Sequence, residues 1–204
     1  MSIFIRLEAL VGARLSVGII AVLAVGIVGC ARDVRVSQGC ASAAMPQGWR
    51  QDPKVPLGVL MTVRSPDKHR FGGLEVEDIL RVEVLPADGM TLSELKDKLS
   101  RITLAELQQH IKEEFKPGLT VPDLRPPVVT SMSVGSTPAV QAVVDTVLTM
   151  EGEPVAARTV TVTALVGGHF YRAAGAYPIA REQQMKPVVD RFLASFRLEG
   201  CGTL

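Results

Sequence analysis

Two successive runs of alternating side chains between residues 140 and 166 constrain the fold of this chain most. Residues 140–150 and 160–166 each place apolar or small side chains at every second position, which is typical of half-buried strands, and His169–Ala174 is the next predicted strand. Short turns at Glu151-Gly152-Glu153-Pro154 and at Gly167-Gly168 separate these three segments. The pattern predicts an antiparallel meander, with Val128–Val134 as a further short strand.

Helices are predicted on both sides of these strands in the sequence. Residues 185–196 carry one apolar face, made by Met185, Val188, Val189, Phe192, Leu193 and Phe196. The segment Thr91-Leu92-Ser93-Glu94 is a capping box, which begins a helix that is kinked or divided near Thr103 and ends at Pro117-Gly118. Two more strands are predicted at 57–63 and 80–84, with a loop between them at Pro66, Gly72 and Gly73. The expected class is α+β, an antiparallel β-sheet meander packed with helices.

Residues 1–29 have the features of an export signal. Arg6 and Arg14 precede fifteen uncharged residues, LSVGIIAVLAVGIVG, a run that is shorter than a membrane-spanning helix needs. The run ends in Ile27-Val28-Gly29-Cys30, which resembles the bacterial lipobox, and this predicts lipidation of Cys30. We therefore expect an extracytoplasmic protein held to a bacterial membrane by a lipid anchor, with an uncleaved membrane anchor as the alternative. Which membrane of the envelope holds it stays open.

The other two cysteines flank the expected domain. Residues 30–45 are small and polar with no clear period, so they predict a flexible tether ahead of a single domain at 46–204. Cys40 and Cys201 are predicted to form a disulfide, since an exported chain meets an oxidising compartment. The alternative is two unpaired thiols in flexible tails.

Composition and charge exclude some classes of function. Lys and Arg number 22 against 21 Asp and Glu, so a nucleic-acid protein with a basic surplus is not expected. The three histidines (His69, His110 and His169) share no metal-ligand spacing, so no metal and no cofactor are predicted. A triad of Ser133 or Ser136 with His169 and Asp145 has no motif to support it, and no catalytic residue is assigned.

A resemblance to a known family rests on three segments. They are Pro46-x-Gly48-Trp49, the meander that leads into Tyr171 through Pro178, and the final helix that ends in Phe192-Leu193-Ala194-Ser195-Phe196. Over residues 46–198 this arrangement resembles the PsbP-like α/β/α sandwich, which includes the extrinsic photosystem II protein PsbP, a yeast Ran-binding protein and small bacterial lipoproteins. The resemblance implies that fold and binding to other proteins. It implies no catalytic residue.

Two segments are candidate binding surfaces. The Pro-rich loop 117–127 carries Leu119, Val121 and Leu124, which are candidate contacts for a protein partner, with a plain connecting loop as the alternative. Residues 64–70, RSPDKHR, form either a basic patch for anionic lipid or a solvated loop.

Three functions follow from these features. The first is a lipid-anchored, non-enzymatic protein that binds an envelope partner. The second is a carrier or sensor of a small apolar ligand between sheet and helices, where Ala142, Ala164, Ala173 and Ala174 leave room. The third is an envelope hydrolase.

Overall fold

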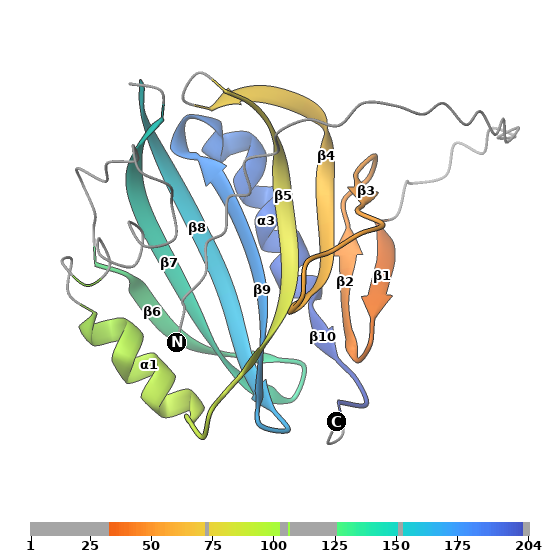
Figure 1. The fold of residues 1–204 in the computed structure, drawn as a ribbon, viewed down its shortest axis with the longest axis vertical. Helices are drawn as coiled ribbons and strands as arrows, with labels where there is room; N and C mark the ends of the chain where they lie inside the picture. Colours follow the sequence, from red (N-terminus) through yellow and green to blue (C-terminus); the bar gives the residue numbers. More distant parts are fainter. Residues whose placement is uncertain (1–32, 72–73, 103–105, 107–125, 151–152, 202–204) are drawn as a thin grey trace, which may run out of the picture.

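The computed structural model describes residues 33–71, 74–102, 106, 126–150 and 153–201. A seven-stranded antiparallel sheet dominates it, with strands in the order β3-β4-β5-β9-β8-β7-β6 (Figure 1). The four strands β6 (Val128–Val134), β7 (Thr137–Met150), β8 (Glu153–Val166) and β9 (His169–Pro178) are consecutive neighbours. The predicted meander is confirmed. The α+β class is confirmed with it.

Strands β4 (Val59–Phe71) and β5 (Leu74–Pro86) are longer than the sequence suggested. They extend into the predicted loop from both sides, up to residues 71 and 74, and β5 pairs with β9. A register shift between Arg64 and Lys68 places Pro66 in a bulge, where its missing N–H leaves no gap in the ladder. In the bulge the Ser65 side chain replaces backbone hydrogen bonds of the ladder. Its Oγ accepts from the Asp78 backbone N–H at 2.9 Å and donates to the Asp67 carbonyl at 2.7 Å.

The C-terminal helix α3 (Glu182–Ser195) covers one face of the large sheet. It follows the short helix η1 (Ile179–Arg181) and buries Met185, Val189, Phe192 and Leu193. Its packing on β9 is close, because a Cβ added to Gly175 would lie 2.8 Å from Leu80 Cδ2 and 2.9 Å from Val189 Cγ1. At this point the layer between sheet and α3 is filled.

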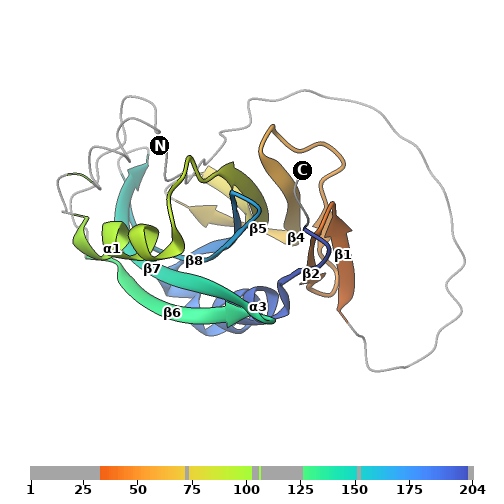
Figure 2. The same cartoon turned by 90° about the horizontal axis from the view of Figure 1, so that it is seen from below.

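The helix α1 (Leu92–Arg101) lies on the other side of the sheet from α3 (Figure 2). Its capping box is present as predicted, with Thr91 Oγ1 accepting from the Glu94 N–H and Glu94 Oε2 accepting from the Thr91 N–H. Leu95 packs with Ala87 and Phe170. The remainder of the predicted helix, apart from Glu106, lies outside the described residues.

The first described residues correct the predicted tether. Residues 34–45 form strands β1 (Val34–Gln38) and β2 (Ala41–Met45), which pair with each other and, through β2, with β10 (Arg197–Leu198). Val36, Ala41 and Ala43 are buried in the main core, so the folded unit starts near residue 34 and the prediction of a flexible tether over 30–45 is wrong there. Small side chains suggested a tether because they have no strong hydrophobic period, yet here they let β2 approach α3. The Ala44 N–H donates to Ser195 Oγ at 2.7 Å.

The predicted disulfide between the chain ends is confirmed. Cys40 and Cys201 form a disulfide, with their Cα atoms 5.1 Å apart, so the alternative of two free thiols is wrong. The two-residue strand β3 (Arg50–Gln51) follows Trp49, whose side chain packs against the core. The disulfide therefore joins the three-stranded sheet to the end of the chain beyond α3.

Candidate functional site

Charged side chains gather on the face of the large sheet that turns away from α3. Gly175 of β9 faces α3, so Arg172, three positions earlier, faces the opposite side. Arg172 lies directly across from Glu83 of β5 and Thr163 of β8, and directly opposed residues share a face. By the same register the neighbouring positions on this side are Arg81, Thr62 and Thr161. We call this set the polar face: Thr62, Arg81, Glu83, Thr161, Thr163 and Arg172.

The centre of the polar face is a buried ion pair. Arg172 Nε donates to Glu83 Oε2 at 2.9 Å, and Arg172 Nη2 donates to the same oxygen. The two side chains are only 7% and 8% exposed. Removing two charges from water is costly, and a buried pair offsets that cost only when its hydrogen bonds are well made. The pair holds β5 and β9 in register at the middle of the sheet.

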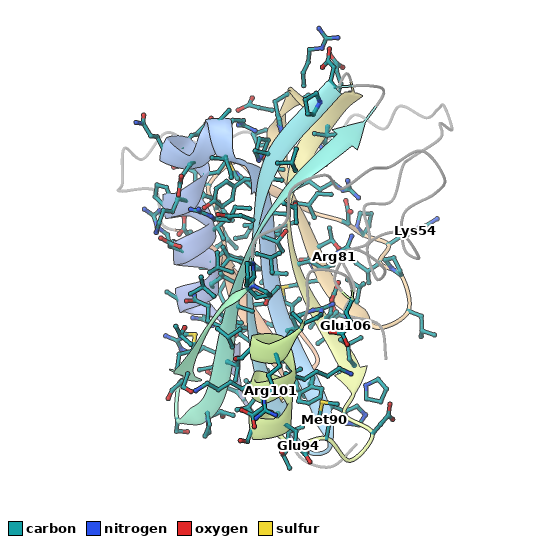
Figure 3. All side chains as sticks on the ribbon, turned by 90° about the vertical axis from the view of Figure 1, so that its left-hand side faces the viewer. Lys54, Arg81, Met90, Glu94, Arg101 and Glu106 are labelled. Atoms are coloured by element: carbon teal, nitrogen blue, oxygen red, sulfur yellow. A yellow bond between two sulfur atoms is a disulfide. The ribbon has the colours of Figure 1, made fainter. Side chains whose placement is uncertain are left out.

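Arg81 is held less completely than Arg172. Its Nη1 atom lies 3.5 Å from Glu83 Oε1, an oxygen of the carboxylate that already accepts from Arg172. Its side chain is 12% exposed, and its Nε atom is buried without a hydrogen-bond partner. Figure 3 places Arg81 on the side of the sheet that carries α1, together with Glu106 and Lys54. A buried guanidinium with an unmade hydrogen bond is suited to a carboxylate or phosphate group from a ligand.

A second charged cluster joins the hairpin to the start of α3. Arg181 Nη1 donates to Asp78 Oδ2 at 2.7 Å and to His69 Nδ1 at 2.6 Å. Because Nδ1 accepts, the His69 ring is neutral with its proton on Nε2, 3.7 Å from Asp78 Oδ1. Burial lowers the pKa of His69, the Asp78 carboxylate opposes that shift, and the Arg181 charge adds to it.

This arrangement predicts a pH-dependent stability. The unfolded chain binds a proton at His69 more tightly than the folded chain does, so stability is complete above the ordinary histidine pKa of about 6.5 and falls as the pH drops below it. We expect the melting temperature to fall less between neutral and mildly acidic pH in His69→Gln than in the wild type. The matched control is His169→Gln, at the first residue of β9. Equal pH slopes for wild type and His69→Gln would rule out this role.

The basic segment predicted at residues 64–70 is not a loop. It forms the second half of β4, and Arg64 Nε donates to Asp52 Oδ2 at 2.6 Å. His69 is occupied by the second cluster. The segment is therefore part of a strand in which Arg64 and His69 are held by contacts within the protein, and only Lys68 and Arg70 remain as exposed basic side chains.

The remaining predicted site residues are placed as follows. Cys30, Leu119, Val121, Leu124 and His110 lie outside the described residues, so their roles stay predictions. Within the described ranges no group of three His, Cys, Asp or Glu side chains could hold a metal ion. Over the same ranges, no helix combines the length and hydropathy that crossing a membrane requires.

One depression of about 230 Å³ lies beside strands β1 and β3. Its lining residues are Gln38, Gln51, Asp52, Pro53, Val55 and Leu60. Asp52, its charged member, is already bound to Arg64. The depression is therefore not the deep apolar cavity that a carrier needs, and the filled layer at Gly175 leaves no such space there either.

A comparison with solved structures shows the fold. The structure is similar to the cyanobacterial PsbP protein CyanoP of Synechocystis sp. PCC 6803, with a TM-score of 0.57 and 14% identity, over 86% of this chain and 97% of that one. The chain has the PsbP-like fold. LpqN of Mycobacterium tuberculosis (TM-score 0.46, 11% identity, 82% and 91% covered) and the Saccharomyces cerevisiae Ran-binding protein Mog1p (0.47, 12%, 81% and 95%) match less closely. No family model and no curated protein sequence matches the chain.

Sequence reasoning did not find the polar face. The alternation of Leu80, Val82 and Val84 with Arg81 and Glu83 predicted a half-buried strand, with the charged residues in water. The sequence does show opposite charges on two separate predicted strands, at Glu83 and Arg172. Only the strand register shows that these two residues lie directly across from each other.

Proposed function

We propose that this chain is a lipid-anchored accessory protein of the bacterial envelope that acts by binding another protein. The anchor is a diacylglyceryl group on Cys30, and the polar face supplies a recognition site. We expect the polar face to bind its partner through hydrogen bonds and ion pairs, because its polar groups are guanidinium, carboxylate and threonine hydroxyl. The PsbP-like fold agrees with such a role, although a fold by itself does not determine function.

The anchored role is supported by the position of the first residues of the folded unit, which lie close to Cys30 in the sequence. Asp33 lies three residues after Cys30 and forms an ion pair with Arg191 of α3, at 3.5 Å. Strand β1 begins at the next residue. A lipid at Cys30 would therefore be joined almost directly to the folded unit, with the Cys40–Cys201 disulfide close to that junction in sequence.

Replacement of Cys30 tests the anchor. In Cys30→Ala the acceptor thiol is absent, so we expect no incorporation of labelled fatty acid and a precursor that keeps residues 1–29. The measurement is metabolic labelling followed by membrane fractionation and mass spectrometry of the intact chain. Cys30→Ser is the closest isostere and should behave like Cys30→Ala. Unchanged processing and acylation in either variant would contradict the lipid anchor.

Arg81 is the residue that we propose recognises the partner. Its unmade hydrogen bond fits an acidic group, and Arg is often an energetically dominant residue at protein interfaces. Leu119, Val121 and Leu124 remain candidate apolar contacts of the same partner. The partner of this proposal is an envelope protein that presents a carboxylate side chain.

Arg81→Gln should separate binding from stability. The melting temperature should stay near that of wild type, because the Glu83–Arg172 pair remains intact, while the amount of partner that co-purifies after crosslinking should fall severalfold. Lys54→Gln makes the same charge change at a residue on the same side of the sheet and should have no effect (Figure 3). Arg81→Lys keeps the charge but loses the planar donor pair, so partial recovery is expected. Full capture by Arg81→Gln would exclude this residue.

A further inference from the structure

We infer that the outer face of the three-stranded sheet rests on the lipid headgroup layer, with Arg35 directed at lipid phosphates. Arg197 lies on the same face, but its Nη1 atom already donates to the Ala194 and Phe196 carbonyls, both at 2.7 Å. This inference rests on the proposed anchor at Cys30. The inference states how the folded domain is oriented on the membrane. A lipid anchor followed by a long tether would leave that orientation undefined. The membrane-proximal face, as we name it, consists of Arg35, Ser42, Arg191 and Arg197.

Chain length limits how far the folded unit can be from the membrane. Three residue steps from Cys30 to Asp33 span at most roughly 11 Å. The headgroup region of one leaflet is roughly 5–7 Å thick, whereas a domain of this size has a radius of gyration of roughly 15 Å. A body of that size on so short a connection cannot roll freely, so the surface around Asp33 must face the lipid.

The side chains near Asp33 suit a headgroup layer. Arg35, Ser42 and Arg197 share the outer face of the small sheet, because Arg35 and Ser42 lie on paired strands and Ser42 pairs directly with Arg197. Arg35 Nη1 donates to Ser42 Oγ at 2.6 Å, and the opposite face of this sheet is buried. Guanidinium groups bind phosphate well because they present paired donors.

One more arginine adjoins this surface. Arg191 is 68% exposed while it pairs with Asp33. Val34 is 59% exposed, but the register places it on the same side of β1 as Val36 and opposite Arg35, so it is not part of the membrane-proximal face. Glu199, at the end of β10, adds an opposing charge, so the attraction comes from individual arginines rather than from a large net charge.

The consequence is a defined direction for the rest of the molecule. Strands β1 and β2 lie at one end of the large sheet, and α1 and β6 lie at the other (Figures 1 and 2). With the small sheet on the lipid, the α1–β6 end points away from the membrane, toward any partner in the aqueous space.

The three cysteines offer a direct test. Cys40 and Cys201 are joined, which leaves Cys30 as the single free thiol of the chain from Cys30 onward. That chain, which contains every described residue, can be coupled through Cys30 to a maleimide lipid in phosphatidylglycerol vesicles. Hydrogen exchange measured by mass spectrometry should then slow severalfold in peptides of β1 and β2 and stay unchanged in α1.

An insertion and a charge reversal test why hydrogen exchange slows in β1 and β2. A long flexible Gly/Ser insertion after Ala31 should abolish the protection of β1 and β2, since the short connection is removed. Arg35→Glu should weaken the protection on anionic vesicles, whereas Lys98→Glu, on α1 at the far end, should not. Protection that survives the insertion, appears on α1 or is absent throughout would overturn the orientation. Because the coupling is chemical, such a failure is distinct from a failure of lipidation in the cell.

Discussion

Loss of the Cys40–Cys201 disulfide is expected to lower the free energy of unfolding by up to about 5 kcal/mol. The bond joins residues 161 positions apart, and the chain-entropy model gives about this value for a loop of that length. The other links between the chain ends are non-covalent, and they include the Ala44–Ser195 hydrogen bond and the Asp33–Arg191 ion pair. Strand β10 contributes two residue pairs to β2, and the Glu199 N–H donates to the Cys40 carbonyl at 2.9 Å. The effect should therefore appear as early loss of the three-stranded sheet.

The measurement is urea unfolding of Cys40→Ala, Cys201→Ala and the double variant. All three should share one lowered midpoint, because each removes the same covalent link. Cys30→Ser serves as the control, since it removes a thiol without touching the bond. If the single variants unfold at the wild-type midpoint, the disulfide contributes no stability and this account of the chain ends is wrong.

Neutralising Glu83 is the substitution with the second largest expected effect. In Glu83→Gln, Arg172 and Arg81 lose the carboxylate that both approach, and Arg172 stays buried at 7% exposure. Breaking a buried ion pair by removing one partner costs about 3–5 kcal/mol. We expect a lowered unfolding midpoint, and faster hydrogen exchange in β5 and β9.

A double variant that removes both charges of the pair is the control. Glu83→Leu combined with Arg172→Met replaces both charges by apolar side chains and should recover part of the loss, because Arg172 is then no longer buried without its carboxylate, while Arg81 still loses its contact with Glu83. Arg81→Gln alone should cost little, as proposed above. If Glu83→Gln is as stable as the wild type, the carboxylate is not a central support of the sheet.

Much of the architecture could be predicted because the local signals and the tertiary structure agree. The alternation in β7 and β8 predicts two strands, the apolar face predicts α3, and the Thr91–Glu94 capping box predicts the start of α1. The disulfide could be predicted from its position at the two ends of the expected core. These features depend on short-range patterns or on chain order, which the sequence contains.

The parts that were missed depend on long-range packing. Ala41 and Ala43 show no hydrophobic period, and only their approach to α3 makes a strand of that segment. Pro66 suggested a loop, but a bulge accommodates it within β4. Alternation shows which face Arg81 and Glu83 lie on, but not what covers that face, so the burial of the polar face could not be anticipated. Leu119, Val121 and Leu124 lie outside the described residues.

Native mass spectrometry of the mature protein, extracted from its own membranes in mild detergent, tests the central claim most directly. We expect a chain that begins at Cys30, carries the mass of its acyl chains, and is accompanied by a second protein whose amount falls in Arg81→Gln. An unprocessed or unacylated chain would contradict the anchor. An acylated monomer that holds only a small molecule, released on activation, would contradict the protein-binding role and favour a carrier.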